Sequence, residues 1–386
     1  MLFVASKKRT RAKNLLLFLA MLIGEKKYKL LMPMHGGGME IFMLNMSNMS
    51  KSLRRVFTAT AVTAAAAAAA GISAYVTTEL WVRTALDREE PEIMKRTGSR
   101  IAGGMKNADF ERKCMAASQM LAERAHETVK IAGGDGVGLT GHFYPCENAK
   151  RVIIAFHGWR SSWNYDYGLI ADFWHENNCS VLYAEQRGQN NSGGEHMGFG
   201  LTERYDCAEW VNWAICRCGK NLPIYLAGIS MGAATVLMAS DLPMHENVCG
   251  IMADCGFTSP KAIWKHVARH NLHMIYGVRG AIADFMCKRK IRMSSEEYSA
   301  TDALKRTKIP VLFVHGTDDR FVPVEMTYEN YKACTSPKRL LIVPGADHAM
   351  SYYVNPHEYE KAVLEFWNDF DRRVDTQKWE EDISEK

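Results

Sequence analysis

A serine set between two glycines is the feature of this sequence that most directly suggests chemistry. The stretch PIYLAGISMGAATVL, residues 223–237, passes from a short apolar run through Gly228, Ser230 and Gly232 into a run of small residues. When a strand precedes G-x-S-x-G and a helix follows it, the motif predicts a nucleophile elbow, whose strained backbone lifts the serine oxygen out of the sheet. The two glycines leave room for that corner. The alternative is a strand-to-helix turn without chemistry.

A serine hydroxyl is a poor nucleophile until a histidine accepts its proton and a carboxylate orients that histidine. Both partners are expected downstream of the serine, each at the end of a strand. The segment HGTDDRFVP follows the apolar run VLFVH and offers Asp318 and Asp319, and PGADHAMSY follows RLLIV and offers His348. The sequence therefore predicts a catalytic triad of Ser230, His348 and one of these two aspartates.

Acyl transfer also needs hydrogen-bond donors for the developing oxyanion. The amide of Met231, directly after the serine, is expected to be the first donor, because the elbow geometry aims it at the reacting carbonyl. The HGW segment follows the apolar run 152–156, and we predict that the amide of Trp159 is the second donor, with its ring in the pocket wall. The alternative for this segment is an ordinary turn.

The elements that must position these residues alternate along the chain. From about residue 127, two strand-like segments flank a turn, and six continuous apolar runs follow, at 152–156, 180–184, 224–228, 248–254, 311–315 and 339–343. Apolar runs without polar alternation are typical of parallel strands that are buried on both faces. Helical patterns separate the runs. We therefore expect a doubly wound α/β sheet with the site at the carboxyl ends of its strands.

The segment between strands at residues 261–307 is longer than its neighbours, and we interpret it as a lid over the site. It carries ten Lys and Arg against four Asp and Glu, with a dense basic run at 286–293. On a domain tethered to a membrane, such a lid would suit anionic lipid headgroups. The alternative is an ordinary solvated helix face.

The motifs HGW, GISMG, HGTDDRFVP and GADHAMSY resemble, in this order, those of the α/β-hydrolase superfamily, especially its bacterial membrane-anchored serine hydrolases of the serine aminopeptidase-like or acyl hydrolase type. The resemblance covers residues 127–372. It implies the α/β-hydrolase fold, with a mostly parallel eight-stranded sheet, flanking helices and a small helical lid. The family places the catalytic acid at the fifth position of H-G-x-x-D, here Asp319. In the loop EQRGQNNSGG, Glu185 replaces the family's aspartate and Asn190 its second glycine.

Residues 56–76 contain no charged side chain over 21 positions. As a helix they would extend about 30 Å, the thickness of a bilayer core. Three basic residues precede the stretch, namely Lys51, Arg54 and Arg55. The positive-inside rule then predicts a single-pass signal anchor in the cell membrane, with the catalytic domain outside the cytoplasm. The alternatives are a cleaved signal peptide and a soluble alanine-rich helix.

The remaining segments are expected to carry no chemistry. Residues 1–55 form a basic extension, whose first 45 or so residues we interpret as an artefact of start-site choice. Residues 77–126 read as a stalk and a helix, and residues 373–386 as a charged tail that follows the catalytic domain.

Composition argues against several classes of function. The first 55 residues hold 11 of the 48 basic residues and 2 of the 43 acidic ones, so the rest of the chain is slightly acidic, which disfavours a nucleic-acid partner. The ten cysteines show no zinc-site spacing or compact disulfide pattern, so we expect buried thiols, no metal and no cofactor. The oligomeric state and any cysteine pairing stay open.

A nucleophilic serine favours esters, thioesters or amides as substrates. The first hypothesis is a carboxylesterase or acyl-lipid hydrolase that acts on a small-molecule or lipid-like acyl substrate. The second is a serine aminopeptidase-like peptidase or a thioesterase, and such a peptidase would need an acidic group for the substrate amine, which the sequence does not identify. A non-catalytic binding protein with the same fold is the remaining alternative.

Overall fold

The computed structural model describes residues 27–33, 39–45, 50–92 and 107–371. The chain divides into two compact units, Met1–Val76 and Thr77–Lys386, and each is described by itself. In the first unit, β1 (Lys27–Pro33) and β2 (Met39–Asn45) pair antiparallel, with Lys27 opposite Asn45. The long helix α2 (Lys51–Leu86) begins in this unit and ends in the second.

Helix α2 contains the predicted anchor at 56–76. Among the described residues it is the one helix that is long and apolar enough to cross a membrane, over Thr58–Leu86. Its run of alanines suits a helix, since alanine has the highest helix propensity. Length and composition are the whole of this support, so the anchor stays a proposal.

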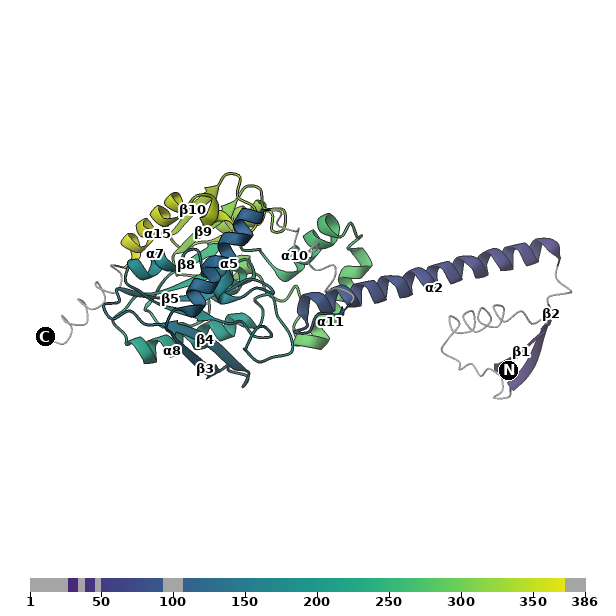
Figure 1. Cartoon of the computed structure of the whole chain (residues 1–386). Coiled ribbons are helices and arrows are strands. Elements are labelled where there is room, and N and C mark those ends of the chain that lie inside the picture. Colours follow the sequence, from purple (N-terminus) through teal and green to yellow (C-terminus); the bar gives the residue numbers. More distant parts are fainter. Residues whose placement is uncertain (1–26, 34–38, 46–49, 93–106, 372–386) are drawn as a thin grey trace. The chain divides into compact units, whose positions relative to one another are not determined.

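The second unit is built on an eight-stranded sheet (Figure 1). The strands lie in the order β10-β9-β8-β7-β5-β6-β4-β3. Strand β4 pairs antiparallel with β3 and β6, and the other neighbours are parallel. The strands are β3 (Glu127–Ala132), β4 (Gly138–Tyr144), β5 (Arg151–Phe156), β6 (Cys179–Ala184), β7 (Ile224–Ile229), β8 (Val248–Asp254), β9 (Val311–Gly316) and β10 (Lys338–Val343). The predicted mostly parallel α/β sheet is confirmed.

The central strands are apolar on both faces because helices cover both faces. Successive residues of β5 alternate between two core clusters: Ile154 belongs to one and Ile153 to the other. The edge strands β3 and β10 keep exposed positions. This contrast between centre and edge is the reason that continuous apolar runs predicted the inner strands within a residue or two.

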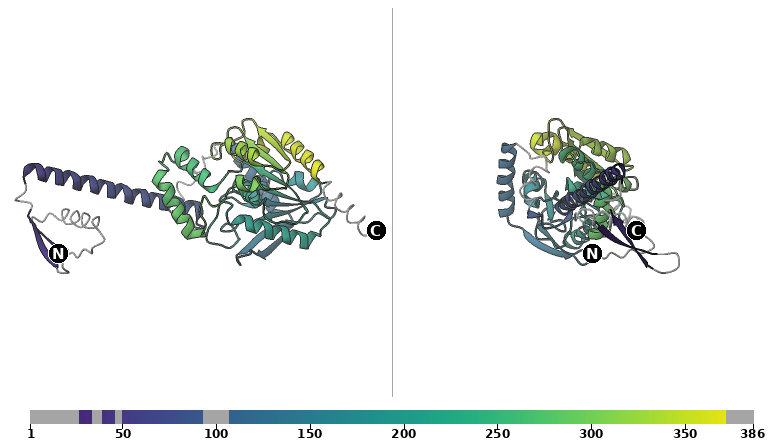
Figure 2. Two further views of the ribbon diagram at one scale, coloured as in Figure 1. Left: turned by 180° about the vertical axis from the view of Figure 1, so that it is seen from behind. Right: turned by 90° about the vertical axis from the view of Figure 1, so that its right-hand side faces the viewer.

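Helices flank the sheet on both faces (Figures 1 and 2). One core cluster takes apolar side chains from α8 (Glu203–Cys218) and α9 (Met231–Ala239). The other takes them from α5 (Ala108–Glu123), α6 (Trp163–Tyr167), α7 (Ala171–Glu176) and α15 (Pro356–Phe370). Two further helices lie near the carboxyl ends of β9 and β10: α13 (Val324–Ala333) and α14 (Ser351–Val354).

Residues 77–92, which we name the N-terminal strap, differ from the expected stalk. Trp81, Val82 and Leu86 are buried in the core of the second unit. The Trp81 ring packs edge-on against Trp264 at 6.0 Å and Tyr276 at 6.4 Å between centroids. An apolar helix face with such partners is buried, where a stalk would be solvated.

The segment predicted as a lid, residues 261–307, is largely helical. It contains α10 (Pro260–His266), the π-helical turn η2 (Val267–Asn271), α11 (Gly277–Ile291) and α12 (Ala300–Leu304). Its side chains meet the strap and Trp159 around a cavity of about 30 Å³. Whether the segment opens and closes as a lid stays a prediction.

Candidate active site

Ser230 sits at the corner between β7 and α9, in a backbone conformation that L-residues rarely adopt, with φ 55° and ψ −112°. A Cβ on Gly228 would collide with the carbonyl oxygen of Gly232, and a Cβ on Gly232 would collide with the carbonyl oxygen of Phe156. The two glycines are therefore required by the close approach of the backbone, as the motif predicted.

The structure brings Ser230, His348 and Asp319 together in one hydrogen-bonded row. The Nε2 atom of His348 lies 2.9 Å from Ser230 Oγ, and its Nδ1 atom lies 2.7 Å from Asp319 Oδ2. The three residues follow β7, β10 and β9, whose carboxyl ends share one edge of the sheet. This row has the order and spacing of a serine–histidine–acid triad.

Asp319 is held in place from several sides. Its Oδ1 accepts the amides of Phe321 at 2.9 Å and Val322 at 2.8 Å, and its Oδ2 also lies 3.1 Å from His315 Nε2. Burial raises the pKa of this carboxyl, but the neighbouring His348 and His315 outweigh burial and lower it well below the usual range. The carboxylate is therefore ionised and fixed in direction.

The pKa of His348 shifts the opposite way. Burial disfavours the imidazolium, but the adjacent Asp319 carboxylate outweighs burial and raises the pKa well above its ordinary value. The ring is accordingly a strong proton acceptor whose neutral form requires a higher pH than a free imidazole does.

Asp318, the other aspartate offered by the sequence, has a different partner. It is exposed, and its Oδ1 accepts a hydrogen bond from the hydroxyl of Thr317 at 2.8 Å. Of the two consecutive carboxylates after β9, Asp318 is exposed, whereas Asp319 is buried and contacts His348.

The amides of Trp159 and Met231 are the two donors predicted for an oxyanion hole. In the loop after β5, the Gly158 amide donates to Asp166 Oδ2 at 2.6 Å, and the Arg160 amide donates to Gln189 Oε1 at 2.6 Å. Among the described residues, no acceptor pairs with the Trp159 amide between them. Met231 opens α9, where first-turn amides have no partner within the helix. Their role as oxyanion donors stays a prediction.

The loop after β6 supports the Trp159 loop through the residues that depart from the family pattern. Glu185 is buried and accepts hydrogen bonds from the amide and side chain of Asn191. Asn190 has a φ of 47°, a conformation that glycine adopts more easily, and its Nδ2 donates to Ser161 O at 3.0 Å. These two departures shape the loop and do not enter the row of Ser230.

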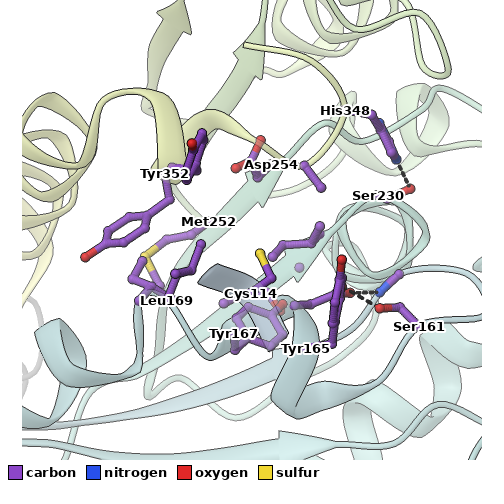
Figure 3. A pocket seen from close by; sticks show the side chains of 18 of the residues that line it. Cys114, Ser161, Tyr165, Tyr167, Leu169, Ser230, Met252, Asp254, His348 and Tyr352 are labelled. Atoms are coloured by element: carbon purple, nitrogen blue, oxygen red, sulfur yellow. Dashed lines mark hydrogen bonds between the residues drawn. The ribbon is translucent and has the colours of Figure 1, made fainter. Parts of the chain in front are cut away.

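A cavity of about 220 Å³ opens beside Ser230 (Figure 3). Side chains from α5, α6 and the α14–α15 region line it, and residues 261–307 contribute none of its lining. Its walls are rich in aromatic rings, namely Phe110, Trp159, Tyr165, Tyr167, Trp174, Phe321, Tyr352, Tyr353 and Tyr359. Apolar walls with a few polar groups are typical of a small-molecule site.

Two carboxylates that the sequence did not single out also line the cavity. Asp166 holds the Gly158 amide with one oxygen and the Ser161 hydroxyl, at 2.5 Å, with the other. Asp254 ends β8 and accepts the hydroxyl of Ser351 at 2.9 Å. Burial raises the pKa of both groups, that of Asp254 to about 6.

Sequence signals for these residues differ. Asp254 closes the apolar run VCGIMAD, and a polar residue at the carboxyl end of a parallel strand is a recognisable signal. Asp166 lies in a short helix and carries no such signal. Neither do Phe110 and Cys114, which reach the cavity from α5, inside the segment expected to have no chemistry.

Cys255 lies against the triad. Its sulfur and one ligand atom each of Asp319 and His348 lie within 4.8 Å of one another, the one such group found in the described part of the chain. Burial raises the pKa of the Cys255 thiol to about 11. A protonated buried thiol is a poor metal ligand, so the arrangement fits a hydrogen-bonded triad better than a metal centre.

Comparisons with known proteins agree with this geometry. The family model described as serine aminopeptidase, S33, matches residues 147–282. The uncharacterized protein YqkD of Bacillus subtilis is 28% identical over 244 residues, covering 61% of this chain and 77% of that protein.

Two solved structures are similar in fold. The esterase Pf2001 of Pyrococcus furiosus superposes with a TM-score of 0.54 at 21% identity, covering 64% of this chain and 91% of that chain. Est1E of Butyrivibrio proteoclasticus, solved with ferulic acid, superposes with a TM-score of 0.50 at 20% identity, covering 63% of this chain and 98% of that chain. With the sheet order, these matches show that the second unit has the α/β-hydrolase fold.

Proposed function

We propose that this protein is a serine hydrolase that cleaves carboxylic esters through an acyl-enzyme, with Ser230 as nucleophile, His348 as general base and acid, and Asp319 as the orienting carboxylate. The observation that carries the proposal is the hydrogen-bonded row Ser230–His348–Asp319, with 2.9 Å and 2.7 Å between its heavy atoms. The esterases among its structural neighbours support ester substrates.

In this mechanism Ser230 Oγ attacks the ester carbonyl carbon while His348 Nε2 takes the hydroxyl proton. The carbonyl oxygen becomes an oxyanion, which the amides of Trp159 and Met231 stabilise by donating hydrogen bonds. Collapse of the tetrahedral intermediate breaks the ester C–O bond, and the imidazolium gives its proton to the departing alcohol. Water, deprotonated by His348, then attacks the acyl-serine and releases the carboxylic acid and the free serine.

Two measurements test this proposal. A fluorophosphonate probe should label the folded wild-type chain and leave Ser230→Ala unlabelled; equal labelling of the two, or none of either, contradicts it. A series of p-nitrophenyl esters of increasing acyl length, run beside aminoacyl anilides, then identifies the preferred bond. Absence of labelling in a folded sample would instead favour the non-catalytic binding protein.

A peptidase of the aminopeptidase-like type is the second candidate function, because such a peptidase needs an acidic group for the substrate amine, and Asp166 is an acidic residue that lines the cavity beside Ser230. The family model matched by residues 147–282 points the same way. Faster turnover of aminoacyl anilides than of neutral esters, lost in Asp166→Asn, would establish it. Preference for neutral esters that survives Asp166→Asn would contradict it, and a thioesterase would instead prefer acyl thioesters.

We also propose that residues 56–76 anchor the chain in the cell membrane and hold the catalytic unit outside the cytoplasm. The apolar stretch within Thr58–Leu86 and the basic residues before it support this topology. The full chain should stay in the membrane pellet after alkaline carbonate extraction and be cut by protease added to spheroplasts. Release by carbonate contradicts the anchor, and protection from the protease contradicts the orientation.

The basic segment 286–293 lies in the same helical region as two exposed apolar side chains, Ile275 and Val278, which are 86% and 76% exposed. In the same unit, the Arg279 side chain donates to Thr77 Oγ1 at 2.9 Å, so this surface adjoins the residue that follows the proposed anchor. These features support contact with anionic headgroups. Hydrogen exchange of residues 272–293 should slow in anionic vesicles relative to neutral ones, and equal exchange contradicts the contact.

A further inference from the structure

We infer that the N-terminal strap, residues 77–92, is a functional part of the active site, and that Arg160 is the positioning residue through which the strap holds the Trp159 amide. The inference rests on the proposed serine hydrolase function. It adds a role for a segment that precedes the catalytic sheet in sequence and contributes no reacting group.

The guanidinium of Arg160 binds three backbone carbonyls of the strap. Its Nε and Nη2 donate to Thr84 O at 3.0 Å and 2.8 Å, its Nη2 also donates to Asp87 O at 2.6 Å, and its Nη1 donates to Arg88 O at 3.2 Å. The Thr84 carbonyl lies in the last turn of α2, where helix geometry leaves it without an intrahelical partner, and the other two follow the end of the helix. A planar guanidinium satisfies several of them at once, which the single ammonium of a lysine does not.

The residue before Arg160 makes a second link to the same segment. Trp159 Nε1 donates to Ala85 O at 3.0 Å. Arg160 itself has a φ of 51°, so the loop turns sharply at this point and needs contacts to hold it. The side chains of Trp159 and of the next residue, Arg160, are thus both fixed to the strap. They hold the loop on the carboxyl side of the Gly158–Trp159 peptide, which carries the proposed oxyanion donor.

The strap is rigid enough to act as a support. Leu86 is fully buried, and Asp87 forms an ion pair with Lys290 of α11 at 2.6 Å. Arg88 donates to Asn190 O and Ser192 O, each at 2.5 Å. The strap is therefore also held from the side of α11 and from the loop after β6, through contacts that do not include Arg160.

Two arginines of the same region offer a matched comparison. Arg160 ties the strap to the loop of the proposed oxyanion donor, whereas Arg88 ties the strap to residues 190–192. Loss of either weakens the docking of the strap, but only loss of Arg160 releases the Trp159 loop directly. If the strap had only a structural role, loss of Arg160 and loss of Arg88 would lower kcat to a similar extent.

The test compares full-length Arg160→Met, Arg160→Lys and Arg88→Met with the wild type. On a short-chain p-nitrophenyl ester, Arg160→Met should lower kcat on the order of 10²-fold, the effect of a misplaced donor, with KM changed only a few-fold. Its Ki for an aryl boronic acid, which forms a tetrahedral adduct with the serine, should rise in parallel. Arg160→Lys should regain part of kcat, and Arg88→Met should lose thermal stability with a much smaller loss of kcat.

Equal losses of kcat and boronate affinity in Arg160→Met and Arg88→Met would overturn the inference, as would a rise in KM alone. If Arg160→Met does not fold, Trp159→Phe removes the bond to Ala85 and should lower kcat and boronate affinity together; unchanged values overturn the inference. A wild type without Ser230-dependent hydrolysis refutes the proposed function instead, so the two failures are distinguishable.

Discussion

The two corners that would meet the substrate are built in opposite ways. The corner at Ser230 is set by residues next to it in sequence: the end of β7, the start of α9 and the two glycines that let them approach. The corner at Trp159 depends on distant segments, the strap at 77–92 and the loop after β6. A nucleophile can therefore be recognised locally, whereas its oxyanion donors depend on tertiary contacts.

The largest loss of activity should follow from changing Asp319, the carboxylate that orients His348 beside Ser230. Asp319→Asn should lower kcat by about 10⁴-fold, because an amide in this position favours the wrong tautomer of His348. Asp318→Asn is the matched control, since Asp318 is exposed and its carboxylate accepts from Thr317. Steady-state kinetics on one ester would measure both variants; similar losses in the two would show that the acid has been misassigned.

The local corner should also be intolerant of one added methyl group. Gly232→Ala should lower the free energy of unfolding by about 3 kcal/mol, since the new Cβ meets the Phe156 carbonyl oxygen. Gly138→Ala, where nothing lies within 4 Å of the new Cβ, should stay within about 0.5 kcal/mol of the wild type. Chemical denaturation compares the two, and a stable, active Gly232→Ala would contradict the account of the elbow.

The distant corner should respond more mildly, since several contacts share its support. Asn190→Gly removes the hydrogen bond to Ser161 O but relieves the positive φ. We expect kcat to fall about 10-fold, as a slightly loosened donor would give, with thermal stability nearly unchanged. Kinetics and a melting curve on the same sample test this, and a large fall in stability with unaltered kcat would assign Asn190 a structural role only.

The smallest expected effect is a shift in the pH dependence of kcat/KM. Because Asp319 raises the pKa of His348, kcat/KM should fall as the pH drops through an apparent pKa above 6.5, where the imidazole becomes protonated. In Asp319→Asn the residual kcat/KM should fall at a lower pH than in the wild type, because the carboxylate charge that raised the pKa of His348 is gone. The pH dependence of kcat/KM, followed at a wavelength where product absorbance does not depend on pH, tests both the wild type and the variant. The same apparent pKa in the two would exclude His348 as the group that titrates.

Much of the fold was predictable because the pattern of buried strands is visible residue by residue. The run 248–254 coincides with β8, and the other five apolar runs differ from their strands by a residue or so at an end. The residues after β9 left two adjacent aspartates open, and the family pattern chose Asp319, the one that lies beside His348 in the structure. The docking of Trp81 and the carboxylate of Asp166 in the cavity left no periodic signal.

Thus the sequence by itself determined the sheet, the elbow and the order of the triad residues, because strand burial and close backbone packing constrain residue types at neighbouring positions. The resemblance to a known family added the choice of Asp319 over Asp318, and only the tertiary structure revealed the carboxylates in the cavity and the contacts of the strap. Each of these depends on a contact between segments far apart in the chain, such as Arg160 with Thr84, and residue type alone does not encode which distant segments meet.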